Sequence, residues 1–154
     1  METNRVKISA ALTGVSLLFL DTAPVIYQVE KNAVYFDRVA AIFQAIDAGQ
    51  ISAMTSPVTL AECLVHPLRQ WLAPVRQAFI DAIVNGANTT FIEIGQSIGE
   101  LAAQFRADYN LRLPDSLQLA AAIINGCDAF LTNDTQLKRV PGIRVLVLDE
   151  LESD

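Results

Sequence analysis

The sequence predicts an α/β protein: a three-layer α/β/α domain around a central, mainly parallel sheet of five strands. Two observations lead to this fold class. Five short apolar runs recur along the 154 residues, and stretches with helical spacing separate them. Strands that are apolar on both faces belong to sheets that helices cover on both sides, and intervening helices make neighbouring strands parallel.

Each predicted strand is a short run of apolar residues. The first ends directly at Asp21, the third is rich in β-branched and aromatic residues, and the fifth is almost entirely apolar. The five predicted strands are residues 17–20, 51–54, 89–94, 129–132 and 143–148.

Helical spacing together with helix-boundary residues predicts six helices. Gly49 ends the second of them, and Gly126 ends the last. Ser56 is a suitable N-cap and Pro57 a suitable first residue for the third, which we expect to bend or stop near Pro67. The predicted helices are residues 24–29, 34–48, the helix that begins at 57, 75–84, 96–109 and 114–125.

Composition indicates one folded domain over residues 17–154. Hydrophobic residues make up 52% of the chain and charged residues 18%, which excludes intrinsic disorder. The two cysteines provide neither a disulfide framework nor a four-ligand zinc site, so we expect a reduced, cytoplasmic compartment. The net charge of −6 excludes a protein that binds DNA through a basic surface of its own.

Residues 1–16 form a leader for which the sequence predicts no particular structure. Arg5 and Lys7 precede an apolar stretch over residues 10–20, as in a signal peptide, but a suitable cleavage site is missing. The stretch is also too short to span a bilayer. We therefore expect it to lead into the first strand of a soluble protein that has no membrane association.

Four acidic residues occupy corresponding places around the predicted sheet. Asp21 follows the first strand, Glu62 lies early in the helix after the second, Asp115 begins the helix before the fourth, and Asp134 follows the fourth. In a parallel sheet these places meet at one edge, where ligands bind. Each acid alone could cap or complement a helix N-terminus. Together they repel one another, which indicates a bound cation or a role in proton transfer.

Oxygen ligands of this kind suit Mg²⁺, which takes a few carboxylates and keeps several waters. The chain has one histidine, so it offers no cluster of soft ligands for zinc. Such an ion could activate water for attack on a phosphodiester. Three basic residues flank the acids and could position phosphates or could simply be exposed charges: Arg112, Lys138 and Arg139.

Four segments resemble the acidic motifs of PIN domains, most closely the small toxins of bacterial and archaeal VapBC toxin–antitoxin modules. They are Leu-Phe-Leu-Asp21-Thr22-Ala-Pro-Val-Ile-Tyr27, Thr59-Leu-Ala-Glu62-Cys-Leu, Leu-Arg-Leu-Pro-Asp115-Ser-Leu-Gln-Leu-Ala-Ala-Ala and Phe-Leu-Thr132-Asn-Asp134. The resemblance extends from Leu17 to Leu148.

The resemblance implies a PIN-like fold and a Mg²⁺- or Mn²⁺-dependent endoribonuclease. Asp21, Glu62, Asp115 and Asp134 would bind the metal, and the hydroxyl of Thr132 would help to hold the site. It also implies a homodimer, a cognate antitoxin that inhibits the nuclease, and operator DNA bound only through that antitoxin. The apolar helix faces over residues 40–46 and 120–124 also suggest a dimer.

Several alternatives stay open on the sequence alone. The fold could serve a non-catalytic interaction module or another Mg²⁺-dependent phosphohydrolase. Cys63 and His66 could form a nucleophile pair, although a buried cysteine usually acts as a small hydrophobe. We expect Trp71, with Phe79 and Phe105, to belong to the core or a dimer face. The acidic residues between 149 and 154 should form a solvated tail.

Overall fold

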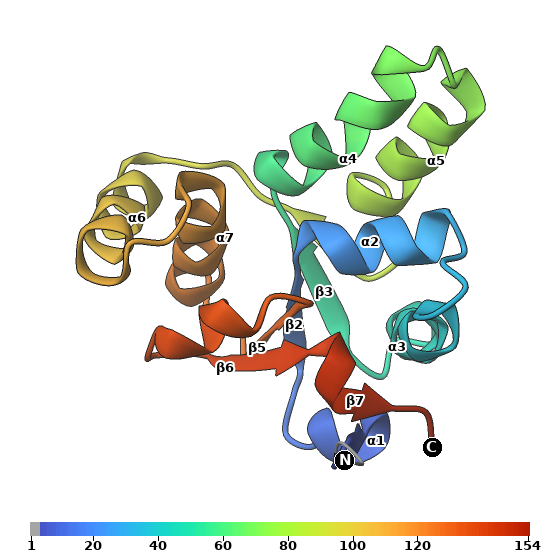
Figure 1. Cartoon of the computed structure of the whole chain (residues 1–154), viewed down its shortest axis with the longest axis horizontal. Coiled ribbons are helices and arrows are strands. Elements are labelled where there is room, and N and C mark those ends of the chain that lie inside the picture. Colours follow the sequence, from blue (N-terminus) through green and yellow to red (C-terminus); the bar gives the residue numbers. More distant parts are fainter. Residues whose placement is uncertain (1–3) are drawn as a thin grey trace.

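A computed structural model describes residues 4–154 and contains a parallel sheet of five strands (Figure 1). The strand order is β4-β3-β2-β5-β6, and every adjacent pair is parallel. The strands are β2 (Leu17–Leu20), β3 (Ser52–Thr55), β4 (Thr89–Phe91), β5 (Ala129–Thr132) and β6 (Arg144–Val147). The predicted fold class is confirmed.

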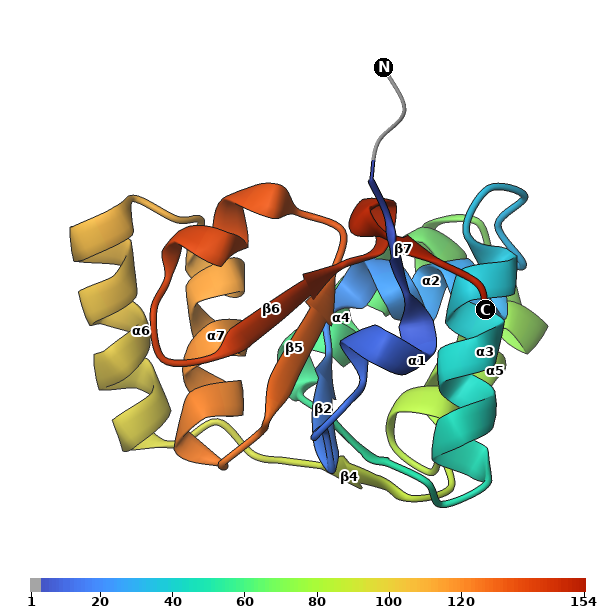
Figure 2. The same ribbon diagram turned by 90° about the horizontal axis from the view of Figure 1, so that it is seen from below.

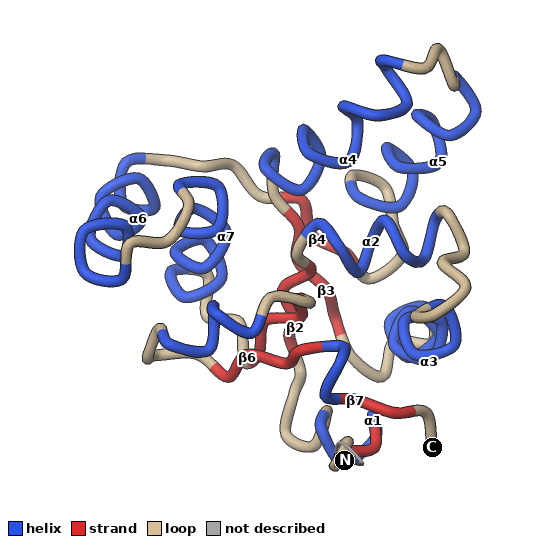
Figure 3. Tube along the Cα trace, in the orientation of Figure 1, coloured by secondary structure: helices blue, strands red, loops and turns tan. Residues whose placement is uncertain are grey.

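Helices cover both faces of this sheet (Figure 3). One face carries α6 (Gln96–Tyr109) and α7 (Leu113–Ile124). The other carries α2 (Thr22–Val29), α3 (Phe36–Asp47), α4 (Pro57–Arg69) and α5 (Ala73–Ile83).

Successive residues of β2 belong to two separate cores, one on each face of the sheet. Leu18 and Leu20 pack in the core beneath α2, α3 and α5, whereas Phe19 packs in the core beneath α6 and α7. Phe19 also stacks on Phe130 of β5, with ring centroids 5.3 Å apart. The central strands are therefore buried on both faces, which explains their nearly continuous apolar sequences.

One predicted helix boundary is confirmed and one predicted strand boundary is wrong. Helix α4 passes through Pro67 and ends close after it, at Arg69, as expected. Pro67 is buried, and its carbonyl accepts a hydrogen bond from the Leu72 N–H in the turn to α5. The predicted third strand, residues 89–94, is too long, because β4 ends at Phe91. Phe91 pairs with Thr55, and the N–H of Ile92 donates to the carbonyl of Thr55, the last residue of β3. Beyond this point β3 offers no further residue for pairing.

The N-terminal segment joins the end of the chain. Strand β1 (Val6–Lys7) pairs in parallel with β7 (Leu151–Glu152) in a separate two-stranded sheet (Figure 2). The short helix α1 (Ile8–Ala11) follows, and Ile8 and Ala11 are buried in the core beneath α3. Of the predicted leader, residues 1–3 lie outside the described part of the chain.

The acidic side chains of residues 149–154 are exposed or partly exposed, as predicted, but the segment is not a free tail. Leu148 and Leu151 are buried, and they fix the 3₁₀ turn η2 (Leu148–Glu150) and strand β7 on the body of the protein. The charged side chains between them face outward. Burial of the two leucines therefore decides the position of this segment, despite its acidic side chains.

Trp71 is not a core residue. It is 92% exposed, whereas Phe79 and Phe105 are buried as expected. The residue lies in the turn between α4 and α5, outside both helices, with a left-handed backbone, φ = +56°. Among residues 4–154, no helix is long and apolar enough to cross a membrane.

Candidate active site

A cleft of about 260 Å³ opens at the carboxyl ends of β2 and β5. This is the edge at which ligands bind in parallel sheets. The residues that line it come from three distant segments of the chain: Asp21, Thr22, Ala23, Ile26, Tyr27, Arg112, Asp115, Thr132, Asn133 and Asp134. Three of the four predicted acids, the predicted hydroxyl and one predicted basic residue therefore share a single cleft.

Asp21 lies on the floor of the cleft and is only 7% exposed. It directly follows β2, and its N–H donates to the carbonyl of Leu131, extending the pairing with β5. The Thr132 hydroxyl donates a 2.8 Å hydrogen bond to Asp21 Oδ2. Burial raises the pKa of the Asp21 carboxyl, and the bond from Thr132 opposes this rise.

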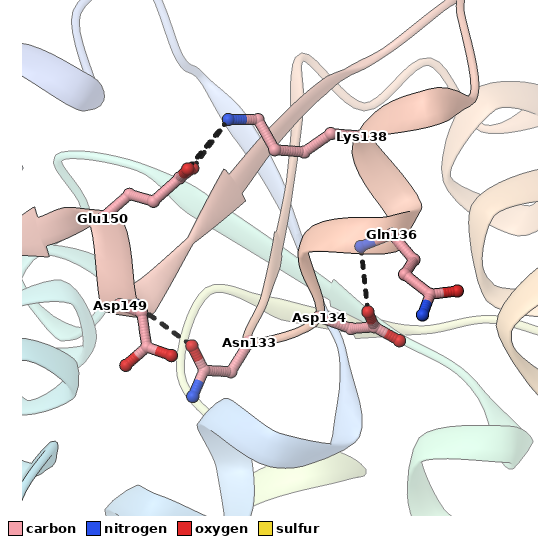
Figure 4. Close-up of polar contacts among 6 residues, drawn as sticks. All are labelled: Asn133, Asp134, Gln136, Lys138, Asp149 and Glu150. Atoms are coloured by element: carbon pink, nitrogen blue, oxygen red, sulfur yellow. Dashed lines mark hydrogen bonds and ion pairs between the residues drawn. The ribbon is translucent and has the colours of Figure 1, made fainter.

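Thr132 also connects Asp21 with Asp134. Its Oγ1 accepts a 3.2 Å hydrogen bond from the Asp134 N–H while it donates to Asp21. Asp134 Oδ1 in turn accepts a 2.9 Å bond from the Gln136 N–H and caps the 3₁₀ turn η1 (Thr135–Arg139) (Figure 4). Helix capping therefore describes part of the role of Asp134.

Asp115 lies in the first turn of α7 and is half-buried. Burial and, after it, the negative charges of Asp21, Asp134 and Glu62 raise its pKa to about 6, against the effect of Arg112. Each of the other three predicted acids thus acts on this carboxyl. The four carboxylates therefore repel one another, which a single aspartate that only capped a helix would not experience.

Glu62 lies beside the cleft rather than in its lining. Its Oε1 accepts a 2.7 Å hydrogen bond from the hydroxyl of Thr22, which does line the cleft. Its Oε2 is 3.9 Å from Nη2 of Arg112. The Arg112 side chain is 72% exposed, so the guanidinium lies at the mouth of the cleft, close to solvent.

Lys138 and Arg139 do not line the cleft, unlike Arg112. Lys138 Nζ lies 2.7 Å from Glu150 Oε1 and points away from Asp134 (Figure 4). Arg139 Nε donates to the carbonyl of Gln136. Of the three predicted basic residues, the structure brings only Arg112 to the acids.

A buried polar network supports the site and was not predicted. Gln118, one turn after Asp115 in α7, donates a 2.7 Å hydrogen bond to Thr59 Oγ1 and accepts one from the Ser56 hydroxyl. Thr59 donates to the carbonyl of Leu20, next to Asp21. All three polar side chains are fully buried. The single glutamine in the apolar sequence of α7 is the feature that could have revealed the network.

The donor set suits a hard divalent cation, since it consists of carboxylate oxygens with unrelieved negative charge. Within residues 4–154, however, no three potential ligand side chains already converge closely enough to hold an ion. Mg²⁺ tolerates this arrangement because it keeps several waters and needs few direct carboxylate ligands. The residues present therefore fit such an ion without forming a closed cage.

Cys63 lacks the properties of a nucleophile. Burial raises the pKa of its thiol, the opposite of the shift found in reactive cysteines. His66 is exposed on the outer part of α4. The Cys63–His66 alternative has no support in this geometry.

The PIN domain family model matches residues 18–143, which contain all four acids and the whole cleft. This chain belongs to the PIN domain family. A search of curated proteins found no match. Solved structures of the same fold include the VapBC2 complex of Rickettsia felis with promoter DNA, with 16% identity and a TM-score of 0.69 over 85% of this PIN domain chain and 98% of the other.

Two further structures show the same likeness to this PIN domain. A sarcin–ricin loop cleaving VapC toxin of Mycobacterium tuberculosis is 14% identical, with a TM-score of 0.68, over 83% of this chain and 98% of its own. A toxin–antitoxin complex of Klebsiella pneumoniae is 24% identical, with a TM-score of 0.62, over 86% of this chain and 98% of the other. With sequence identities this low, the similarity shows that these proteins share the fold.

Proposed function

We propose that this PIN domain is a Mg²⁺- or Mn²⁺-dependent endoribonuclease and the toxin of a VapBC-type toxin–antitoxin pair. The observation that carries the proposal is the single cleft at the carboxyl ends of β2 and β5, which Asp21, Asp115 and Asp134 line together with Arg112. A set of acids that repel one another around an open cleft is suited to a cation and a phosphate-bearing substrate.

In this proposal, Asp21, Glu62, Asp115 and Asp134 hold the ion. When bound, the ion would lower the pKa of a water nucleophile and offset charge on the leaving oxygen. Thr132 keeps Asp21 and Asp134 in place through the two hydrogen bonds of its hydroxyl.

Arg112 is the residue we assign to the substrate phosphate. Its exposed guanidinium lies at the mouth of the cleft, where a phosphate can reach it. For Lys138 and Arg139 we favour the alternative of exposed charge, because both point away from the acids or bind elsewhere.

The proposed partners follow from the similar structures. Several of these are toxin–antitoxin complexes, and some contain promoter or other DNA. We propose a cognate antitoxin for this chain, with operator DNA bound through that antitoxin, since the chain carries a net charge of −6. We also propose a cytoplasmic location, where RNA and antitoxin are both accessible.

A homodimer stays part of the proposal, but the apolar helix faces no longer support it. Ile42, Ile46 and Ala120–Ala122 are buried within the chain itself. Sedimentation velocity at several concentrations tests it: a dimer at micromolar concentration is expected, and a monomer throughout contradicts it.

Cleavage of RNA tests the central proposal. Purified protein should cut RNA with Mg²⁺ or Mn²⁺, and EDTA should stop the reaction. Asp115→Asn should lower the rate on the order of 10²–10³-fold, as loss of one preorganised electrostatic group does. The matched control is Asp108→Asn, an exposed carboxylate on α6, which should leave the rate unchanged.

Two outcomes contradict the proposal. Undiminished cleavage in EDTA excludes the metal mechanism. Absence of cleavage by the unmodified protein under all metal conditions favours the remaining alternatives, a non-catalytic interaction module or a phosphohydrolase with another substrate.

A further inference from the structure

One wall of the cleft is aromatic. Tyr27 of α2 lines it together with the acids and Arg112. The acids and Arg112 provide chemistry for a phosphate and a metal, but the acids offer no aromatic face on which a nucleobase could stack. Tyr27 is the aromatic residue among those that line the cleft.

Tyr27 stacks on an aromatic residue that does not itself line the cleft. Tyr35 stacks on one face of its ring, with centroids 4.5 Å apart and planes inclined by 12°. The guanidinium of Arg38 lies over the Tyr35 ring, 5.2 Å from its centroid, and donates to the carbonyl of Leu148. The Tyr35 hydroxyl donates to Asp149.

The hydroxyl of Tyr27 is fixed as well. It accepts a 3.2 Å hydrogen bond from Asn133 Nδ2, and Asn133 Oδ1 accepts a 3.0 Å bond from the Asp149 N–H (Figure 4). Asn133 directly precedes Asp134, so the ring is placed relative to the acids by a short chain of bonds. Such a ring is preorganised for stacking, and binding to it costs little side-chain entropy.

We propose that Tyr27 is the nucleobase-binding wall of this cleft, on which an unpaired base of the RNA stacks while its phosphate reaches Arg112 and the acids. The inference rests on the proposed ribonuclease function, and it adds that the RNA must present an unpaired base. Tyr35 covers one ring face, and the base occupies the side of Tyr27 that is turned to the cleft. Because stacking needs an exposed base face, the site selects single-stranded or extruded nucleotides over paired ones.

Kinetics of two substitutions separate the ring from its hydroxyl. Tyr27→Leu removes the aromatic face, so the KM for a single-stranded RNA should rise about tenfold with kcat unchanged. Tyr27→Phe keeps the ring and loses the bond from Asn133 that helps to place it, so its KM should rise clearly less than that of Tyr27→Leu. Melting temperatures of both variants show whether they are folded.

A binding measurement in EDTA detects stacking without cleavage. The probe is a short single-stranded RNA that contains 2-aminopurine, whose fluorescence falls when the base stacks. Unmodified protein and Tyr27→Phe should quench it, whereas Tyr27→Leu should not. The matched control is Trp71→Leu, which removes a 92% exposed aromatic residue outside the cleft and should leave the quenching intact.

Four results overturn the inference: quenching that persists in Tyr27→Leu, quenching lost in Trp71→Leu instead, equal impairment of Tyr27→Phe and Tyr27→Leu, or no quenching by the unmodified protein. The ribonuclease proposal has its own criterion. If the unmodified protein cleaves RNA and Tyr27→Leu has the same KM and quenching, only the assignment of Tyr27 to base binding is overturned. Tyr27-dependent quenching without any cleavage overturns only the ribonuclease.

Discussion

The side-chain amide of Gln118 donates a 2.7 Å hydrogen bond to the hydroxyl of Thr59, and it thereby joins α7 to α4 inside the protein. Asp115 lies one helical turn before Gln118, and Glu62 lies three residues after Thr59, so residues at this spacing share a helix face. The bond therefore sets the separation of two helices that each carry an acid of the site.

Replacing Gln118 with leucine should destabilise the fold. The buried hydroxyls of Ser56 and Thr59 would lose their partner, at a cost of about 1–3 kcal/mol in the free energy of unfolding. Urea unfolding measures this cost. Gln104→Leu, on the exposed face of α6, should change the free energy by less than about 0.5 kcal/mol. Equal effects at the two positions would contradict the structural role of the network.

Arg112 and Lys138 should differ in their effect on RNA binding. Arg112→Ala should raise the KM for RNA about tenfold, because a charge-assisted bond to phosphate is lost. The salt dependence of binding should also weaken. Lys138→Ala removes a residue that is paired with Glu150 outside the cleft, so the KM should not change. Neither change should cost more than about 1 kcal/mol of stability, since both ion pairs are exposed.

The metal-free protein should lose stability as the pH rises through the titration of Asp115. The pKa of this carboxyl is raised from 3.8 to about 6, so the folded chain binds more protons than the unfolded chain between these values. The melting temperature of Asp115→Asn, minus that of the unmodified protein, should therefore increase from pH 3.8 to about pH 6 in EDTA. A difference that shrinks over this range would show that ionised Asp115 stabilises the fold.

A divalent ion should reverse this repulsion. Mn²⁺ at about 100 times its dissociation constant should stabilise the folded chain by ~2.7 kcal/mol, which raises Tm by about 5–10 °C. Protons compete for the same oxygens, so the increase should be larger at pH 7 than at pH 5, on either side of the Asp115 pKa of about 6. Differential scanning calorimetry with and without Mn²⁺ measures both effects, and an equal increase in Asp115→Asn would place the ion elsewhere.

The sheet and the positions of the acids could be predicted because both depend on strong, local patterns. Buried strands of a parallel sheet are nearly continuous apolar runs. Asp21 comes directly after one of them and Asp134 two residues after another. The strands β1 and β7 could not be predicted, since two residues are too few to show a period. Their pairing depends on contacts between the two ends of the chain.

The contacts and exposure of individual side chains were the other feature that the sequence did not predict. Sequence position placed Lys138 beside Asp134, but its partner Glu150 lies on a different segment and draws it away from the cleft. Trp71 was assigned by its hydrophobicity, whereas a left-handed turn decides its exposure. An ion pair between two segments decided the first case, and the turn in which the residue lies decided the second.

The bond between Asp21 and Thr132 joins residues 111 positions apart. A ribosome-bound chain that has not yet emerged as far as β5 has the first acid but neither the hydroxyl that fixes it nor Asp134. The cleft therefore cannot form during translation before residues 132–134 have left the ribosome.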